Sequence, residues 1–312
     1  MSGGVSSAYE PDQETFRDAP NASQYTVTLT RKEVAAYFER SGGHPSRSLG
    51  QNFVVDPNTV RRIARLADVT AYTKVVEIGA GLGSLTMALA ETGASIIAIE
   101  IDKWLIDELR TNVGSLSNVT IVHADAMELD WHALLPPEDG PYVLVANLPY
   151  NVATPLICDL LDDVPQITRM LVMVQKEVAD RLAAPPRSEF YGAVSVKVAY
   201  YAESKVVGVV PPSVFLPQPK IDSGLVGIDR RPQPAISVAD VTPEWLFSVI
   251  KGGFAQRRKM LRRALSGVVS PEAFIAANVD SQRRAEELDI NEWGRLAIAS
   301  YAPEATVSPS AG

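Results

Sequence analysis

Short apolar runs alternate with stretches of helical spacing through most of this chain. Between Lys74 and Arg230 the runs are rich in Val and Ile and are bounded by turn residues, which is typical of buried strands. The runs are 75–78, 95–99, 119–122, 142–146, 169–174 and 225–228. Strands that alternate with helices predict an α/β fold with a doubly wound, Rossmann-like sheet.

Two further runs, 194–198 and 206–210, fit either a helix or a pair of strands, and periodicity does not decide between them. After Thr242 the apolar positions have helical spacing. Thr242 is a favourable N-cap before Pro243, and Ser270 is expected to open another helix. The sequence therefore predicts a small all-helical domain at the C-terminal end.

Composition suggests the boundaries of these domains. Residues 1–28 are rich in Ser, Gly, Pro and Asp and lack a period, so we expect a disordered tail. The remaining divisions are an α/β domain over 29–230, a polar linker over 231–240, a helical domain over 241–302 and a second tail over 303–312.

The first predicted strand leads into three glycines at alternate positions, Gly79, Gly81 and Gly83, and then into a helix. Such a turn lets a ligand approach the backbone at the helix N-terminus. Glu100 ends the next strand about 20 positions later, where an acid accepts from ribose hydroxyls. These features fit NAD and S-adenosylmethionine equally. The glycine spacing is not the full pyrophosphate fingerprint, and Glu77 is placed to orient the turn.

Asp125 follows the third predicted strand. Its carboxylate can accept from the amino group of an adenine, although an Asp at this place is also typical of a helix cap or turn. The carboxyl ends of parallel strands meet at one edge of a sheet, which would bring Asp125 near Gly79 and Glu100. We therefore favour a ligand contact.

The strand 142–146 stops at Asn147-Leu148-Pro149-Tyr150. The proline ends the strand, which leaves a neutral amide, a backbone carbonyl and an aromatic ring at the sheet edge. The amide oxygen and the Leu148 carbonyl can accept from an exocyclic amine, and Tyr150 can stack on the base that carries it. An ordinary exit from a strand is the alternative interpretation of these four residues.

Composition excludes several classes of function. No run of 18 or more apolar residues predicts a membrane span, and the N-terminus has no signal pattern. One cysteine, Cys158, fits a reducing compartment, and the three histidines form no cluster with it that is typical of a metal site. We therefore expect no resident metal.

The net charge of −8 argues against nucleic-acid binding, but the charges are unevenly distributed. Residues 251–263 contain six cations and no acid: Lys251, Arg257, Arg258, Lys259, Arg262 and Arg263. On one continuous helix, Arg258 would lie beside Arg262 and Lys259 beside Arg263, forming a positive face. A solvated helix face is the simpler interpretation, and it applies equally to Arg61, Arg62 and Arg65.

Ordered blocks of the sequence resemble the KsgA/RsmA family of small-subunit ribosomal RNA adenine dimethyltransferases. The blocks are Leu49–Asp56, Glu77–Gly83, Glu100–Asp102, Asp125–Ala126, Asn147–Asn151, Gln175–Ala179, Phe215–Ser223 and Phe254–Leu261. The resemblance extends from about Leu29 to about Tyr301. Together these motifs are highly specific, although no single one is.

The resemblance implies a class I methyltransferase with S-adenosylmethionine as its cofactor, and it favours a helix over 194–198. It implies cofactor contacts from Gln51, Asn52, Phe53, Val54, Glu77, Gly79, Gly81, Glu100, Ile101, Asp125, Ala126 and Asn147. The implied catalytic group is Asn147, Leu148, Pro149, Tyr150 and Phe215, with Phe215 as a second stacking face unless it plugs the core below a proline-rich loop. Implied RNA contacts are Lys220, Arg257, Arg258, Lys259, Arg262 and Arg263.

The resemblance also implies a reaction and a partner. The expected reaction transfers methyl groups to the N6 amines of two adjacent adenosines in a hairpin loop near the 3′ end of small-subunit (16S) rRNA. The expected setting is an immature 30S particle in the cytoplasm, with the protein acting as a monomer and away from membranes.

Three other functions remain to be weighed. A ribosome assembly factor with secondary methylation fits the same resemblance, and large-subunit enzymes of the macrolide-resistance type share the catalytic motif. The combination of Gln51-Asn52-Phe53, Asn147-Leu148-Pro149-Tyr150 and Phe215-Leu216-Pro217-Gln218-Pro219 favours the small-subunit group. An NAD oxidoreductase is disfavoured by the glycine spacing and by the Asn-Leu-Pro-Tyr motif.

Overall fold

The computed structural model describes residues 28–301. The two predicted tails lie outside the described residues except for Thr28, which is fully buried. The core of the α/β part is a seven-stranded sheet in the order β4-β3-β2-β5-β6-β9-β7. Its strands are β2 (Lys74–Ile78), β3 (Ser95–Glu100), β4 (Val119–His123), β5 (Tyr142–Asn147), β6 (Ile167–Gln175), β7 (Ala202–Val210) and β9 (Ser223–Arg230).

The strand order confirms the predicted doubly wound sheet. The chain moves outward from β2 to β3 and β4 and then returns to place β5 on the other side of β2. Ligands of open α/β sheets bind at such a switch point, beyond the carboxyl ends of the strands. The sheet is mixed, because β9 runs antiparallel to both β6 and β7. The strand predicted at 225–228 therefore lies inside the sheet, and β7 forms its edge.

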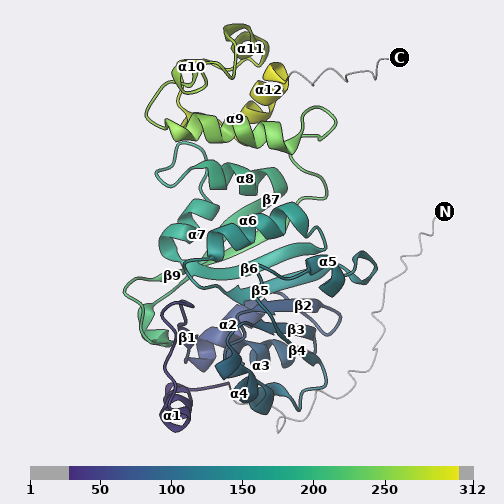
Figure 1. Ribbon diagram of the computed structural model, residues 1–312, viewed down its shortest axis with the longest axis vertical. Helices are drawn as coiled ribbons and strands as arrows, with labels where there is room; N and C mark the ends of the chain where they lie inside the picture. The colour runs from purple at the N-terminus through teal and green to yellow at the C-terminus, as the bar shows by residue number, and fades with distance from the viewer. Residues whose placement is uncertain (1–27, 302–312) are drawn as a thin grey trace, which may run out of the picture.

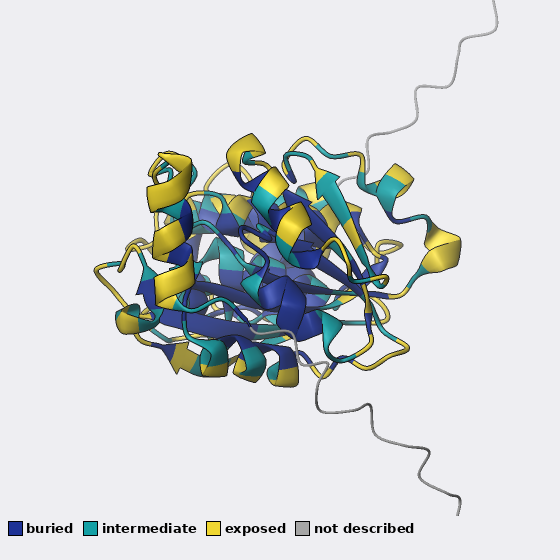
Figure 2. Cartoon of the chain, turned by 90° about the horizontal axis from the view of Figure 1, so that it is seen from below, coloured by how far each residue is buried: buried dark blue, intermediate teal, exposed yellow. Residues whose placement is uncertain are grey.

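Helices cover both faces of the sheet (Figure 1). The residues of the central strand β5 between Leu144 and Ala146 are at most 1% exposed, as expected for a strand buried on both faces. Figure 2 shows this buried core enclosed by helices whose outer surfaces are exposed. The helices of this part are α1 (Arg31–Ser41), α2 (Pro57–Leu66), α3 (Ser84–Ala90), α4 (Lys103–Val113), α5 (Trp131–Leu134), α6 (Ala153–Asp163), α7 (Lys176–Leu182) and α8 (Ala193–Tyr201).

The segments that periodicity left undecided form α8 followed by the edge strand β7. The helix expected from the family resemblance is therefore confirmed. Short 3₁₀ turns span Pro137–Asp139, Pro212–Val214 and Ala285–Glu287. A separate two-stranded ribbon pairs β1 (Phe53–Val54) with β8 (Phe215–Leu216) in antiparallel register.

The C-terminal part is helical, as predicted, and consists of α9 (Pro243–Ala255), α10 (Leu261–Ala264), α11 (Pro271–Ala276) and α12 (Ile290–Ser300). Its core surrounds Trp293, which is fully buried, and extends to Tyr200 of α8 and to Tyr191 just before that helix. The hydroxyl of Tyr191 donates to the carbonyl of Leu288 over 2.7 Å. The helical part therefore shares a core with α8, which lies directly against it in Figure 1.

The predicted linker is packed in this structure. The backbone N–H groups of Arg231 and Ala235 donate to the carbonyls of Tyr201 and Tyr200, each over 2.8 Å. Ile236 is 9% exposed and belongs to the core of the helical part. These contacts fix residues 231–236 along α8.

The predicted continuous helix across 251–263 is wrong. Helix α9 ends at Ala255, and α10 begins at Leu261 after an intervening turn. Met260 is extended and forms a bridge with Arg284, while the N–H of Leu261 donates to the carbonyl of Arg283 over 2.8 Å. These long-range backbone bonds replace the bonds that would have continued the helix.

Candidate functional site

The glycine turn forms at the carboxyl end of β2, as predicted. Gly81 and Gly83 have positive φ angles of 59° and 92°, which side-chain-bearing residues rarely adopt. A Cβ at Gly81 would lie 3.2 Å from the Phe53 ring, and one at Gly83 would lie 2.8 Å from Val113. Glycine is therefore required both by the backbone and by the close packing of β1 and α4 around the turn.

Glu100 holds this turn in place. One of its carboxylate oxygens accepts from the N–H of Gly81 over 2.7 Å, and the other accepts from the N–H of Asp102 over 2.8 Å. The side chain is 4% exposed, and burial raises the pKa of its carboxyl while the two backbone donors oppose that shift. The prediction that Glu77 orients the turn is corrected here, because Glu100 makes the contact.

Glu77 is the more isolated of the two acids. It is 1% exposed, and its Oε2 has no hydrogen-bond partner among the described residues. Burial raises the pKa of Glu77 to about 8; Thr86 opposes the rise, and Glu100 adds to it. The carboxyl is therefore largely protonated at neutral pH.

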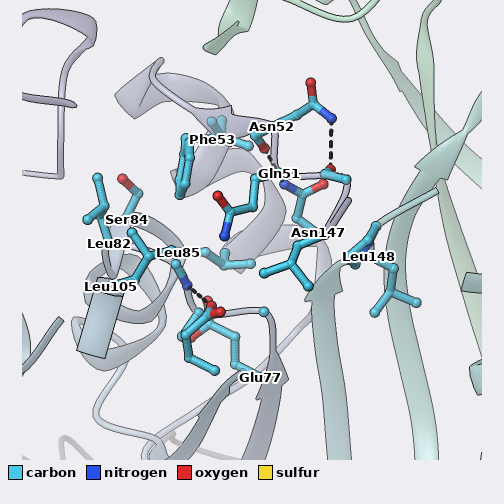
Figure 3. A pocket seen from close by; sticks show the side chains of 18 of the residues that line it. Gln51, Asn52, Phe53, Glu77, Leu82, Ser84, Leu85, Leu105, Asn147 and Leu148 are labelled. Carbon is cyan, nitrogen blue, oxygen red and sulfur yellow. Dashed lines mark hydrogen bonds between the residues drawn. The ribbon is translucent and has the colours of Figure 1, made fainter. Parts of the chain in front are cut away.

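One cavity brings together most of the predicted site residues (Figure 3). It lies between the glycine turn, β1 and the end of β5. The predicted cofactor residues on its wall are Gln51, Asn52, Phe53, Val54, Glu77, Gly79, Gly81, Glu100, Ile101 and Asn147. Leu148, Pro149 and Tyr150 line the same cavity. Groups from four separate sequence blocks thus converge on one space.

Asp125 and Ala126 line a second, adjoining cavity. The two cavities share Leu49, Gly79, Ile101 and Pro149 on their walls. The wall of the second cavity is otherwise largely apolar and includes Ile78, Ile99 and Leu156. One carboxylate oxygen of Asp125 accepts from the N–H of Met127 over 2.8 Å, which is the turn contact considered as the alternative. The other oxygen has no hydrogen-bond partner among residues 28–301.

The amide of Asn147 has a defined environment. Its Nδ2 donates to the carbonyl of Asn52 over 2.9 Å, while Oδ1 accepts no hydrogen bond from the described residues. The Leu148 N–H donates to the carbonyl of Met173 over 3.0 Å, whereas the Leu148 carbonyl has no described donor. Two free acceptors therefore lie on adjacent residues at the cavity wall. The hydroxyl of Tyr150 lies 3.2 Å from Ser223 Oγ, which fixes the edge of its ring.

Phe215 does not meet the expectation of an open stacking face. Its side chain is 1% exposed and packs in the same apolar cluster as Val54, and it lines neither cavity. Phe215 is instead a core residue below the proline-rich loop, which is the alternative that the sequence left open. The cause is the pairing of β8 with β1, which places Phe215 opposite Val54.

The basic segment, which we define as Arg257–Arg263, contains one cation that is already paired. Arg257 Nε lies 2.6 Å from Glu286 Oε2, and its Nη2 donates to the carbonyl of Glu189 over 2.8 Å. Arg258, Lys259, Arg262 and Arg263 are exposed and form no ion pair with the described residues. Arg258 and Lys259 lie in the break between α9 and α10, whereas Arg262 and Arg263 lie on α10. Lys220 is exposed in the Phe215–Ser223 block.

Sequence reasoning missed some of the apolar cavity wall. Val34 of α1 and Leu105 of α4 both line the first cavity and are at most 2% exposed. The spacing of Val34 and Tyr37 on α1 indicated an inward face, but nothing local to that helix indicated what it covers. Arg62 donates to the carbonyl of Val209 and Arg61 pairs with Glu91, so these two cations of α2 have structural partners.

Among residues 28–301 no group of His, Cys, Asp and Glu side chains is arranged to hold a metal ion, and no helix of that range is long and apolar enough to cross a membrane.

The switch-point sheet, the glycine turn and the paired cavities define a Rossmann-like methyltransferase. Residues 44–300 match the family model described as ribosomal RNA adenine dimethylase. The chain belongs to this family.

Relatives and solved structures agree with that placement. The chain is 47% identical over 278 residues to ribosomal RNA small subunit methyltransferase A of Kineococcus radiotolerans, covering 86% of this chain and 90% of that protein. It is 46% identical to the protein of the same name from Streptomyces avermitilis, covering 85% and 90%. The 23S rRNA methyltransferase ErmE is 26% identical, with a TM-score of 0.63 over 80% of this chain and 99% of that one. A dimethyladenosine transferase of Plasmodium falciparum shares the fold, with a TM-score of 0.66 at 23% identity over 77% and 94%.

Proposed function

We propose that this protein transfers methyl groups from S-adenosylmethionine to the N6 amines of two adjacent adenosines near the 3′ end of small-subunit rRNA. Membership of the ribosomal RNA adenine dimethylase family supports the reaction class. The observation that carries the proposal is the pair of free acceptors, Asn147 Oδ1 and the Leu148 carbonyl, beside a cavity built around a glycine turn.

The cavities suit S-adenosylmethionine. The apolar second cavity with its single carboxylate, Asp125, fits an adenine ring and its amine. Glu100 lines the first cavity next to Ile101, which both cavities share, and there it suits a ribose. The unpartnered Oε2 of Glu77 offers a hydrogen bond to a polar group in the first cavity. When bound, the cofactor supplies an electrophilic sulfonium methyl group.

The chain contributes orientation and electrostatics to the reaction. An adenine amine is a weak nucleophile because its lone pair is delocalised into the ring. Acceptors that engage both N–H bonds favour a pyramidal nitrogen with a localised lone pair, and Asn147 and Leu148 offer two such acceptors. Because the Asn147 nitrogen is occupied by the Asn52 carbonyl, the amide oxygen is the atom left to face the substrate. Tyr150 supplies a stacking face for the base, which must leave its stack to enter.

The RNA partner is proposed to be an immature 30S particle. Relatives at 46–47% identity are named for the small subunit, whereas the large-subunit enzyme ErmE is 26% identical. Arg258, Lys259, Arg262 and Arg263, which form no ion pair within residues 28–301, offer contacts to phosphates, and Lys220 is a fifth candidate. We also propose that the protein acts in the cytoplasm, where such particles are assembled, and that it acts as a monomer. An assembly role separate from methylation is a further proposal.

The test measures methyl transfer to purified ribosomal particles. Labelled S-adenosylmethionine is supplied with immature small subunits, mature small subunits and large subunits. The proposal expects label on the immature small subunit in dimethyladenosine, at two adjacent positions. Label confined to the large subunit would instead support the macrolide-resistance type of enzyme, and no transfer to any particle would contradict the proposed activity.

A further inference from the structure

Helix α1 precedes residue 44, where the match to the family model begins. It nevertheless packs against the site. Glu33 caps its first turn, since Glu33 Oε2 accepts from both the N–H and the hydroxyl of Thr30, each over 2.7 Å. This cap fixes the start of the helix and, with it, the position of Arg31.

The buried face of α1 closes the first cavity. Val34 is 1% exposed and lies on the cavity wall in a cluster with Leu82 and Leu105. The hydroxyl of Tyr37 donates to the carbonyl of Trp104 over 2.7 Å, at the start of α4. At the far end of the helix Arg40 pairs with Glu108 over 3.0 Å. The helix is therefore anchored to α4 along its second half.

The first turn of α1 is anchored to a different element. Arg31 Nη2 donates to the carbonyl of Ser213 over 2.7 Å and to the carbonyl of Phe215 over 2.9 Å. A single terminal nitrogen thus uses its two hydrogens on two carbonyls of one loop. Charge-assisted bonds of this kind are stronger than bonds between neutral groups.

That loop is connected to the catalytic motif through backbone bonds. Phe215 pairs with Val54 across the ribbon, and the N–H of Val55 donates to the carbonyl of Val214 over 2.8 Å. Strand β1 follows Asn52, whose carbonyl accepts from Asn147 Nδ2. A continuous series of contacts therefore runs from Arg31 through the β1–β8 ribbon to the amide of Asn147.

We propose that Arg31 is a positioning residue for methyl transfer: it fixes the 213–215 loop and the β1–β8 ribbon, and thereby the Asn52 carbonyl that orients the Asn147 amide. This inference rests on the proposed function and adds to it a residue that precedes the segment matched by the family model. Arg31 does not line either cavity, so it acts through the ribbon.

The test compares three substitutions on the same helix. Arg31→Ala removes both bonds to the loop, and Arg31→Lys keeps the charge but loses the two-hydrogen geometry. Arg40→Ala is the matched control, because it removes a cation of α1 that pairs with Glu108 and does not contact the loop. Steady-state methylation of immature small subunits gives kcat and KM, calorimetry gives the S-adenosylmethionine Kd, and thermal unfolding gives Tm.

Arg31→Ala is expected to lower kcat about tenfold, since misplacement of an orienting group acts mainly in the transition state. KM for the particle and Tm should stay close to wild type, and the cofactor Kd should rise by less than kcat falls, because β1 also carries residues of the cofactor cavity. Arg31→Lys should recover part of the lost kcat, and Arg40→Ala should match the wild type.

Three results would overturn the inference: an unchanged kcat in Arg31→Ala, an equal loss in Arg40→Ala, or a loss of kcat that follows a parallel loss of Tm and cofactor affinity. A wild-type protein that transfers no methyl groups would instead contradict the proposed function itself, and this inference with it.

Discussion

The cofactor cavity and the basic segment are built in opposite ways. The polar groups of the cavity are buried, with Glu77 1% and Glu100 4% exposed, and backbone donors hold Glu100 in one geometry. Four cations of the basic segment are exposed, and the chain between α9 and α10 that carries Arg258 and Lys259 is a turn. The function of the cavity should therefore depend on the exact positions of its polar groups, whereas the function of the basic segment should depend on its positive charge.

This difference predicts two kinds of response to mutation. Buried groups in a low-dielectric site interact strongly and are little screened by salt, so single changes there should have large effects. Exposed cations interact through a screened field, so single changes should be small and salt-dependent.

Asn147→Ala should reduce turnover by about a hundredfold or more, the usual cost of removing a preorganised dipole from an active site. Affinity for S-adenosylmethionine and for the particle should be nearly intact, because the amide acts on the transition state. Single-turnover methylation and calorimetry on the same variant separate the two effects. A fall in turnover of less than tenfold would show that the amide is not the key acceptor.

Glu100→Ala should weaken cofactor binding by about 1–3 kcal/mol, through loss of charge-assisted hydrogen bonds. The substitution also releases the N–H of Gly81, which Glu100 holds over 2.7 Å. Calorimetry against Asp107→Ala, whose side chain is 93% exposed on α4, controls for the loss of an acid near the site. Unchanged affinity, or tight binding of NAD, would remove Glu100 from the cofactor site.

Glu77 should make the stability of the ligand-free protein fall as pH rises. The pKa of Glu77 is raised to about 8 by burial, against 4.5 for an ordinary Glu carboxyl. Between these values the folded state holds a proton that the unfolded state has lost, so the free energy of unfolding decreases from about pH 4.5 to about pH 8. Urea unfolding of Glu77→Gln across this range should show a weaker decrease than the wild type. Parallel pH profiles for the two proteins would contradict the protonated state.

The smallest single effects are expected in the basic segment. Arg258→Ala combined with Arg262→Ala should weaken particle binding and flatten the log-affinity against log-salt slope by about one unit or slightly less for each lost phosphate contact. Cofactor affinity should not change. Arg257→Ala is the matched control, because Glu286 and the Glu189 carbonyl already occupy that side chain. If the double variant kept the wild-type slope, RNA binding would belong to the α/β part.

Sequence predicted the cavity well because its groups occupy strand ends. Glu100 and Asn147 each end a short apolar run, and Glu77 lies one residue before the end of another. Parallel strands bring such ends to one edge of the sheet. The strand–turn–helix at Gly79–Gly83 is likewise a local feature that glycine spacing specifies. The motifs therefore gave both the position of the cavity and most of the residues on its wall.

The failures share one physical cause, which is pairing between segments far apart in the chain. No acid lies near Arg257 in the sequence, but Glu286, 29 positions away, forms an ion pair with it. The helix predicted across 251–263 breaks because Met260 and Leu261 bond to Arg283 and Arg284. Phe215 is buried because β8 pairs with β1, and no local pattern in a two-residue strand specifies that partner.

The most direct test of the proposed activity is a map of dimethyladenosine in ribosomal RNA from cells with and without this protein. We predict two adjacent dimethylated adenosines near the 3′ end of small-subunit rRNA, lost when the protein is absent and not restored by Asn147→Ala. An unchanged small-subunit map in cells that lack the protein, or a loss of modification only in the large subunit, would contradict the proposed function.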